Sequence, residues 1–327
     1  MSSVQPQSWR EERKLTTGPR FDPRLAAPFV EKSLSENTRD AYRRTVREFF
    51  RFLGGISPEQ VTPRDVIRFR DHLLGIGRKS RTVSNKLSIV RSLFEYLRAG
   101  GIVALNPATT KLVMPPAISD APAGRALTPE EVDHILRGPN RSTTEGARDY
   151  ALMMVMLRLS LRLTEVSTLK VSSIKWGDKK WVLTCRVKGG REEKWPVPQD
   201  VKQAIDDYLR LDRERRDTLL CGGEDAYLFQ PVRNHRTLVH DKPLSPRHVE
   251  RIVGRWGDYT GIGKVTPHDL RRTVVTEMLS QGYSYRDVQM VTKHRDPKTI
   301  MTYDRARENL DSSPVNSFAY RKPKTKT

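Results

Sequence analysis

The chain has 327 residues, 36% of them hydrophobic, which is enough for two packed domains and excludes a wholly disordered protein. Lys and Arg number 59 against 39 Asp and Glu, so the formal net charge is +20 and the pI is about 10.1. Residues 1–115 account for +10 of this charge, which excludes a single basic tail as its source. Such an excess favours a partner of opposite charge, most often nucleic acid.

The first predicted domain spans residues 30–112 and is a bundle of about four short helices. Apolar residues recur at helical spacing from residue 35 to residue 53, which predicts an amphipathic helix. The dipeptide Thr62-Pro63 is a capping signal that starts a second helix, and Ser80 opens a third.

The polar positions of these helices are rich in basic residues. They are Arg43, Arg44, Arg47, Arg78, Lys79, Arg81, Lys86 and Arg91. A solvated helix face would also carry such residues, but few acidic residues are interleaved with them between residues 78 and 91. This pattern favours contacts with DNA phosphates.

The second predicted domain spans residues 127–310 and is mainly helical with a small antiparallel sheet, an α+β fold. A capping box at Thr128 starts it, and the apolar run from Ala147 to Leu163 predicts a buried helix. Residues 181–187 and 192–198 alternate like two strands around a Lys-Gly-Gly-Arg turn, so we expect a β-hairpin.

Three further segments lack a periodic apolar face. Residues 1–29 mix Pro, Ser, Gln and charged residues, and we expect a flexible N-terminal arm. Residues 113–126 are rich in Pro and Ala, which is typical of a linker between domains. Residues 311–327 form a basic tail with two aromatic residues, either a disordered end or a segment that docks on DNA or a neighbouring subunit.

The stretch from Thr266 to Asp304 concentrates two histidines, several arginines and one tyrosine between short apolar runs. Thr266 is a helix N-cap signal followed by proline at the first helical position. His268 and Arg271 are three residues apart on this helix and share a face. This segment is therefore predicted to hold most of an active site.

Six side chains of the second domain together have the chemistry of phosphoryl transfer. They are Arg162, Lys188, His268, Arg271, His294 and Tyr303. Guanidinium groups can hold phosphate oxygens, a tyrosine hydroxyl can attack phosphorus, and a lysine can protonate a leaving oxygen. No acidic cluster or His-x-x-x-His pair accompanies them, so no metal is expected.

Each of these residues has an ordinary explanation when it is taken alone. Arg162, for example, can be a structural arginine paired with Glu165 one turn away. The joint order and spacing carry the argument, with 26 residues from His268 to His294 and nine from His294 to Tyr303.

The motifs that contain these residues resemble those of the tyrosine recombinases, or phage integrases. Their first arginine box is similar to L-S-L-R-L-T-E-V-S-T-L-K, and their lysine hairpin resembles V-K-G-G-R-E-E-K. Their remaining boxes resemble H-D-L-R-R, K-H-R-D and T-I-M-T-Y-D, in the usual order. The resemblance covers about residues 33–303. It implies an N-terminal helical SAM-like core-binding domain and a C-terminal catalytic domain that form a clamp around DNA.

The resemblance also implies a role for each residue that binds the phosphate or the leaving group. Arg162 and Arg271 would bind the scissile phosphate, and His294 would donate a hydrogen bond to one of its oxygens. Lys188 would protonate the leaving 5′ oxygen. Arg186 and Lys194 on the same hairpin remain alternatives to Lys188.

Tyr303 would be the nucleophile that forms a 3′-phosphotyrosyl link to DNA. The resemblance implies that His268 assists proton transfer at the tyrosine and that Glu165 supports the site from outside the reacting groups. Arg272 competes with Arg271 for the phosphate only if the helix is rotated.

The sequence departs from the family pattern at two places. Ser160 stands where the family usually has glycine, two residues before the first arginine. Thr292-Lys293 stands where leucine-glycine usually precedes the last histidine. These departures leave the six side chains in place and concern the local backbone geometry.

The resemblance implies a site-specific recombinase that cuts and rejoins DNA without ATP, metal or any other cofactor. Its partner would be a double-stranded recombination site, bound by a homotetramer in the synapsed state and by a monomer or weak oligomer when free. Two alternatives stay open, a topoisomerase-like enzyme that relaxes DNA as a monomer and a DNA-binding relative without catalysis.

Cysteine content and hydropathy indicate the compartment. Cys185 and Cys221 are too few for a disulfide framework or a cysteine zinc site. No stretch approaches the roughly 20 apolar residues of a membrane span, and the N-terminus lacks the apolar core of a signal peptide. We expect a cytoplasmic protein associated with the nucleoid.

Overall fold

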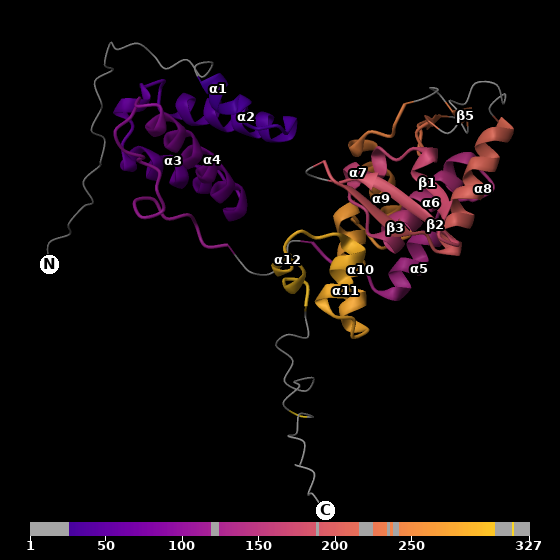
Figure 1. The fold of residues 1–327 in the computed structure, drawn as a ribbon. Coiled ribbons are helices and arrows are strands. Elements are labelled where there is room, and N and C mark those ends of the chain that lie inside the picture. The colour runs from indigo at the N-terminus through magenta and orange to yellow at the C-terminus, as the bar shows by residue number, and fades with distance from the viewer. Residues whose placement is uncertain are drawn as a thin grey trace, which may run out of the picture. The chain divides into compact units, whose positions relative to one another are not determined.

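The computed structural model describes residues 26–118, 124–187, 190–215, 225–233, 236–237, 242–304 and 316. The chain divides into two compact units, residues 1–119 and 120–327 (Figure 1). Residues 1–25 of the predicted arm, Lys188, Cys221 and the predicted tail apart from Asn316 lie outside the described residues. Within the described part of the chain, no helix is long and apolar enough to cross a membrane.

The first unit is a helical bundle. Its helices are α1 (Ala27–Glu31), α2 (Glu36–Phe52), the short 3-10 helix η2 (Pro58–Gln60), α3 (Pro63–Gly75) and α4 (Ser80–Ala99). Phe49 on α2 meets Phe69 on α3 and Phe94 on α4 edge to face, with ring centroids 5.1 and 6.1 Å apart. All three rings are fully buried, so aromatic packing joins the three long helices into one core.

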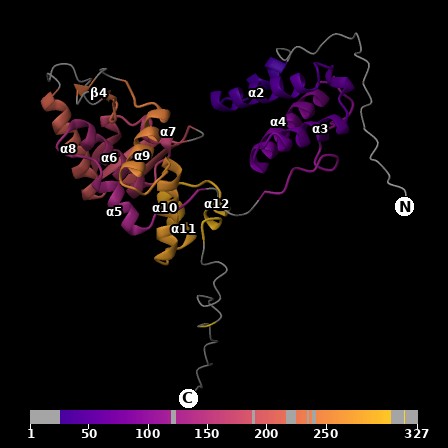
Figure 2. The ribbon, with the colours of Figure 1, turned by 180° about the vertical axis from the view of Figure 1, so that it is seen from behind.

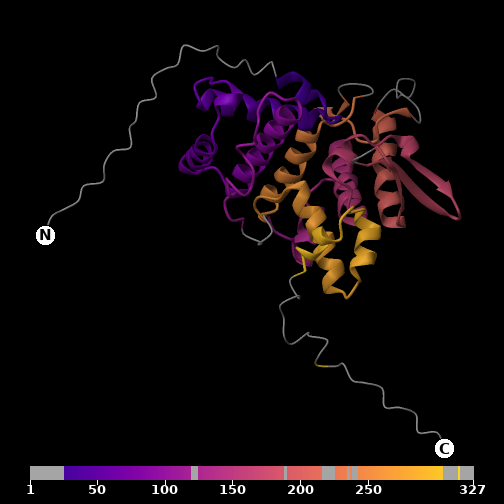
Figure 3. The ribbon, with the colours of Figure 1, turned by 60° about the vertical axis from the view of Figure 1, so that its left-hand side comes forward.

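The second unit contains a three-stranded antiparallel sheet at one edge of a mainly helical body (Figure 3). Its strands are β1 (Ile174–Gly177), β2 (Lys180–Arg186) and β3 (Glu192–Pro196), in the order β1-β2-β3. Leu183 on β2 pairs with Trp195 on β3, and both side chains are buried. Two short strands, β4 (Val232–Arg233) and β5 (Arg236–Thr237), form a separate hairpin.

The helices of this unit, in chain order, are α5 (Pro129–Arg137), α6 (Thr144–Leu159), α7 (Leu163–Ser167), the 3-10 helix η3 (Val171–Ser173), α8 (Gln199–Arg215), α9 (Pro246–Tyr259), α10 (Pro267–Ser280), α11 (Tyr285–Thr292) and α12 (Lys298–Met301). Helix α6 is buried along most of its length and packs against α8 and α10 (Figure 2). Helices α10 and α11 lie side by side in all views (Figure 3). The predicted mainly helical fold with a small antiparallel sheet is therefore confirmed.

The predicted β-hairpin is present as β2 and β3, and the structure departs from the sequence expectations at two other places. The predicted buried helix from Ala147 to Leu163 ends at Leu159, because Ser160 adopts a left-handed backbone conformation with φ of 54°. The sheet has a third strand, β1, which pairs with β2 and had no alternating apolar pattern to reveal it.

Candidate active site

Helix α10 places two of the predicted residues. The Thr266 hydroxyl accepts a hydrogen bond from the Asp269 amide, and the Asp269 carboxylate accepts one from the Thr266 amide at 2.9 Å. This capping box fixes the first turn of the helix. His268 and Arg271 consequently start from one rigid helix end, and Arg271 is only 4% exposed.

The Arg271 guanidinium is held by backbone carbonyls from two other segments. It donates hydrogen bonds to the Ser160 oxygen, after α6, and to the Thr292 oxygen, at the end of α11. Its Nη2 also lies 3.3 Å from Nε2 of His294. Burial, and next the nearby positive charge of Arg162, lowers the pKa of Arg271 to about 10. The side chain therefore remains a cation near neutral pH.

Arg162 precedes α7 and is tied to that helix by Glu165. The Glu165 carboxylate accepts hydrogen bonds from the Arg162 amide at 2.7 Å and from its Nη1 at 2.9 Å. Glu165 is 3% exposed, whereas the Arg162 side chain is 31% exposed. The ion pair thus orients an accessible guanidinium, and the contact that the predicted supporting role of Glu165 requires is present.

His294 is oriented by a threonine that motif reasoning treated only as a departure. The Thr292 hydroxyl donates to the Val288 oxygen at 2.8 Å, so it can only accept at its 2.7 Å contact with Nδ1 of His294. Nδ1 must then carry the ring proton, and Nε2 accepts from Arg271. Burial, then Arg271 and Arg162, lowers the pKa of His294 to about 3, so the ring is neutral.

Tyr303 lies beside His268 in a largely buried position. Its side chain is 8% exposed, and its hydroxyl is 3.4 Å from Nε2 of His268. Burial, then the charges of Arg272 and Arg271, lowers the pKa of His268, while Asp269 opposes this effect. His268 is therefore neutral near pH 7, in the protonation state needed to accept a proton from the tyrosine.

Arg272 is a neighbour of Tyr303 that sequence reasoning treated only as a competitor of Arg271. Its guanidinium carbon lies 5.0 Å from the centre of the Tyr303 ring, and its Nη1 donates to the Gly124 oxygen at 3.0 Å. Arg272 is 4% exposed. A buried cation over the ring stabilises negative charge on the tyrosine oxygen.

The predicted lysine, Lys188, falls between β2 and β3 in the sequence and lies outside the described residues. The alternatives Arg186 and Lys194 are exposed on the strands. Cys185 on β2 is buried, and burial raises the pKa of its thiol to about 12, so it is not an activated nucleophile.

The structure thus brings together five of the six predicted residues. Tyr303 contacts His268, Arg271 contacts His294, and the charge of Arg162 acts on both Arg271 and His294. In the described part of the chain, no group of three or more His, Cys, Asp or Glu side chains could hold a metal ion. The arrangement offers cations for a phosphate and a base for a tyrosine.

The predicted DNA contacts of the first unit divide into two groups. Exposed residues are Arg44, Arg47, Arg78, Lys79 and Arg81. The other three are half-buried and make internal contacts: Arg43 with Glu36 and Asp40, Lys86 with Glu48, and Arg91 with the Ala108 oxygen. DNA binding by all eight residues stays a prediction.

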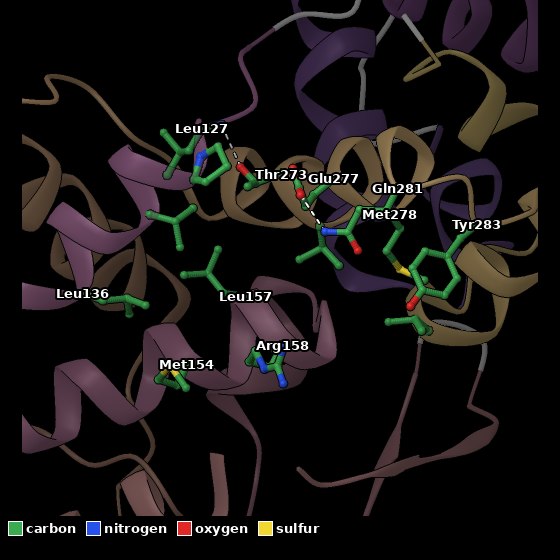
Figure 4. A pocket seen from close by; sticks show the side chains of 14 residues that line it. Leu127, Leu136, Met154, Leu157, Arg158, Thr273, Glu277, Met278, Gln281 and Tyr283 are labelled. Atoms are coloured by element: carbon green, nitrogen blue, oxygen red, sulfur yellow. Dashed lines mark hydrogen bonds between the residues drawn. The ribbon is translucent and has the colours of Figure 1, made fainter. Parts of the chain in front are cut away.

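A separate hollow of about 540 Å³ lies between α5, α6 and α10 (Figure 4). Leu136, Leu157 and Met278 line it, with Arg158 and Glu277 as charged members. Its lining is mainly apolar, so it does not suit a phosphate.

Comparisons with known proteins match both units. Residues 125–309 match the model of the phage integrase family, and residues 25–101 match the phage integrase N-terminal SAM-like domain. A tyrosine recombinase XerC from Roseiflexus castenholzii is 30% identical over 288 residues, 87% of this chain and 88% of the relative. A tyrosine recombinase XerD from Pseudomonas putida is 30% identical, covering 87% of this chain and 92% of the relative.

A similar fold is found among solved structures. A lambda integrase tetramer bound to a Holliday junction superposes with a TM-score of 0.67 at 17% identity, covering 89% of this chain and 78% of that chain.

Proposed function

The chain belongs to the phage integrase family of tyrosine recombinases, and from this membership we propose that Tyr303 is the nucleophile of a DNA strand-cleavage and rejoining reaction. The enzyme is a site-specific DNA recombinase. The observation that carries the residue assignment is the 3.4 Å contact between the Tyr303 hydroxyl and Nε2 of His268, beside two buried arginines.

In the cleavage step, the Tyr303 oxygen attacks the scissile phosphorus and its proton passes to neutral His268. Arg162 and Arg271 bind the non-bridging oxygens and offset the charge that grows in the transition state. The bond from phosphorus to the 5′ oxygen breaks, and Lys188 protonates that oxygen. The products are a 3′-phosphotyrosyl link and a free 5′-hydroxyl end.

His294 takes part through its neutral ring. Its Nε2 accepts from Arg271, so the guanidinium keeps one donor directed at the histidine and others for the phosphate. Rotation of the ring toward the phosphate would let it donate from the protonated nitrogen, as the family resemblance implies.

Rejoining reverses these steps with a 5′-hydroxyl from a partner strand. Because the phosphotyrosyl link keeps the energy of the phosphodiester bond, no ATP and no other cofactor is required. We propose that four copies of the chain act together on two synapsed recombination sites in the cytoplasm, with both units in contact with DNA. The match of residues 25–101 to the SAM-like domain favours this reaction over relaxation of DNA by a monomer.

The test is to trap the protein on DNA in cells with denaturant, recover the attached DNA and sequence its ends. Wild-type protein should carry DNA through a 3′ link at one repeated sequence. Tyr303→Phe should bind duplex DNA as wild type does and yield no attached DNA. Tyr259→Phe, which removes a hydroxyl from a tyrosine that is 73% exposed, is the matched control and should behave as wild type. Attached DNA on Tyr303→Phe would contradict the assignment.

A further inference from the structure

A second hollow, of about 330 Å³, lies beside His294 and is distinct from the apolar one. Its charged lining comes from Arg191 and Glu193 on the β-hairpin, Arg286 on α11, and Lys293 and Arg295 on either side of His294. His294 forms part of the wall, so the hollow adjoins the residue that contacts Arg271.

Positive charge dominates this hollow. Four cationic side chains face one carboxylate, because Glu193 is its acidic member and His294 is neutral. Glu193 lies 3.5 Å from Lys293 and 3.9 Å from Arg191. Among the described residues, neither Arg286 nor Arg295 has an acidic partner within the 4.0 Å of an ion pair, and both are exposed. Two guanidinium groups are therefore available to an anion.

Lys293, which lines the hollow, has an unusual backbone conformation. Lys293 has φ of 52°, a left-handed conformation that costs a residue with a side chain about 1 kcal/mol or more. Glycine would fit this position with less strain. The chain instead places a lysine there, and its Nζ is 5.4 Å from the Trp195 ring and paired with Glu193 at the edge of the hollow.

We propose that this hollow binds a phosphate of the DNA strand next to the scissile phosphate, a subsite that fixes the register of the strand over Tyr303. The inference rests on the proposed function. His294 lines the hollow and also contacts Arg271, so a phosphate at Arg271 and a phosphate in the hollow would flank this one residue as neighbouring phosphates of one strand. Paired guanidinium groups match the oxygens of a phosphate better than a single ammonium does.

The test measures binding of the full-length protein to a random-sequence duplex at several salt concentrations, because phosphate contacts do not depend on sequence. The variant Arg286→Ala/Arg295→Ala should lower the magnitude of the slope of log K against log salt by about 0.9, because the hollow no longer neutralises its phosphate. Arg137→Ala is the control of like chemistry, since Arg137 is 75% exposed on α5 and pairs with Asp133. It should leave the slope unchanged.

Charge-retaining substitution separates the contact from a fold defect. Arg286→Lys/Arg295→Lys should restore most of the slope, and all variants should show wild-type thermal unfolding. An alanine variant with a wild-type slope overturns the inference, including the case in which the hollow serves an acidic protein partner. If only the inference fails, the alanine variant and the wild-type protein both still become attached to DNA through Tyr303. If the wild-type protein does not become attached to DNA, the proposed function itself is contradicted.

Discussion

Two residues beside the candidate active site have left-handed backbones although neither is glycine. Ser160 has φ of 54° and Lys293 has φ of 52°. Ser160 presents its carbonyl oxygen to Arg271, and Lys293 leads into His294. At both positions the chain turns next to a residue of the candidate site, Arg271 or His294. The backbone strain of these turns is maintained by the surrounding contacts.

Ser160→Gly should make the protein more stable. Ser160 is fully buried, and its hydroxyl has no hydrogen-bond partner among the described residues. Glycine relieves the left-handed strain of about 1–2 kcal/mol and removes that hydroxyl, while its entropy in the unfolded chain costs about 0.5–1 kcal/mol. We expect a net gain of about 1 kcal/mol in the free energy of unfolding, measured with denaturant.

Ser160→Ala is the control that separates the two contributions. Alanine removes the hydroxyl and keeps the left-handed strain, so its gain should be smaller than that of glycine. An alanine variant less stable than wild type would mean that the serine hydroxyl has a favourable role, and a glycine variant less stable than wild type would contradict the predicted gain.

His294 should make the folded state lose stability in acid. Its ordinary pKa of 6.5 falls to about 3 in the fold. Between these two values the histidine is protonated in the unfolded chain and neutral in the folded chain. The free energy of unfolding therefore decreases as pH falls from 6.5 toward 3. His268, whose pKa is also lowered, acts in the same direction. Melting temperatures measured from about pH 7 to about pH 4 should decline through this window.

His294→Gln should flatten that decline, because the titrating ring is gone and an amide can still face Arg271. His134→Gln replaces an exposed histidine on α5 and serves as the matched control. Equal slopes for all three proteins would show that acid lability comes from other groups.

The residues of the candidate site could be named from sequence because each belongs to a short motif with its own chemistry. The contacts between these residues could not be predicted, because Arg162 and Tyr303 are far apart in the chain and only the fold brings them together. Thr292 was named only as a departure from the pattern. Its hydroxyl sets the tautomer of His294, a role that depends on the Val288 carbonyl and has no sequence signal.

At the scale of elements, Asp149 joins two helices that frame the site. It is fully buried on α6 and accepts from Arg148 at 2.7 Å, and from Arg255 and Trp256 on α9 at 2.5 and 2.8 Å. Helix α6 ends at the residue before Ser160, whose oxygen holds Arg271. The position of α6 is therefore coupled to Arg271, which we propose binds the scissile phosphate.

Asp149→Ala should destabilise the second unit by about 3–5 kcal/mol, because the buried Arg148 loses the carboxylate at 2.7 Å and keeps only that of Glu145 at 3.8 Å. Asp133→Ala removes the carboxylate of an exposed pair with Arg137 and should cost less than about 1 kcal/mol. Denaturant unfolding of the two variants measures both changes. Similar small losses would mean that the Asp149 network adds little to the fold.

Sequence patterns located most elements because caps and apolar periodicity are local signals. The capping boxes at Thr62, Thr128 and Thr266 all start helices in the structure. The end of α6 was missed because apolar character continues past Ser160, while the turn depends on backbone geometry. Strand β1 was missed because its central residues are exposed, so no alternating pattern marks it.

At the scale of the whole molecule, the net charge of +20 is the feature of the sequence that pointed most directly to a nucleic-acid partner. The chain that carries this charge divides into two compact units. Charge alone does not say which basic residues reach DNA, because some of them are used inside the fold. Lys86 is paired with Glu48 and is 18% exposed, whereas Arg78, Lys79 and Arg81 are exposed at the start of α4.

The exposed basic residues and the internally paired Lys86 should be distinguished by measuring DNA binding and unfolding of variants of the full chain. Arg78→Ala/Lys79→Ala/Arg81→Ala should lower the magnitude of the salt slope of binding to random duplex DNA by about 0.9 for each phosphate that is no longer neutralised, up to about 2.7. Lys86→Ala should leave that slope unchanged and instead lower the free energy of unfolding by about 1 kcal/mol, since it breaks a half-buried ion pair.

The reverse result would reassign the DNA-binding face of the first unit. A wild-type slope in the triple variant, together with a reduced slope in Lys86→Ala, would mean that DNA competes with Glu48 for the lysine. The start of α4 would then be a solvated surface, and the charge that binds DNA would lie on the face shared by α2 and α4.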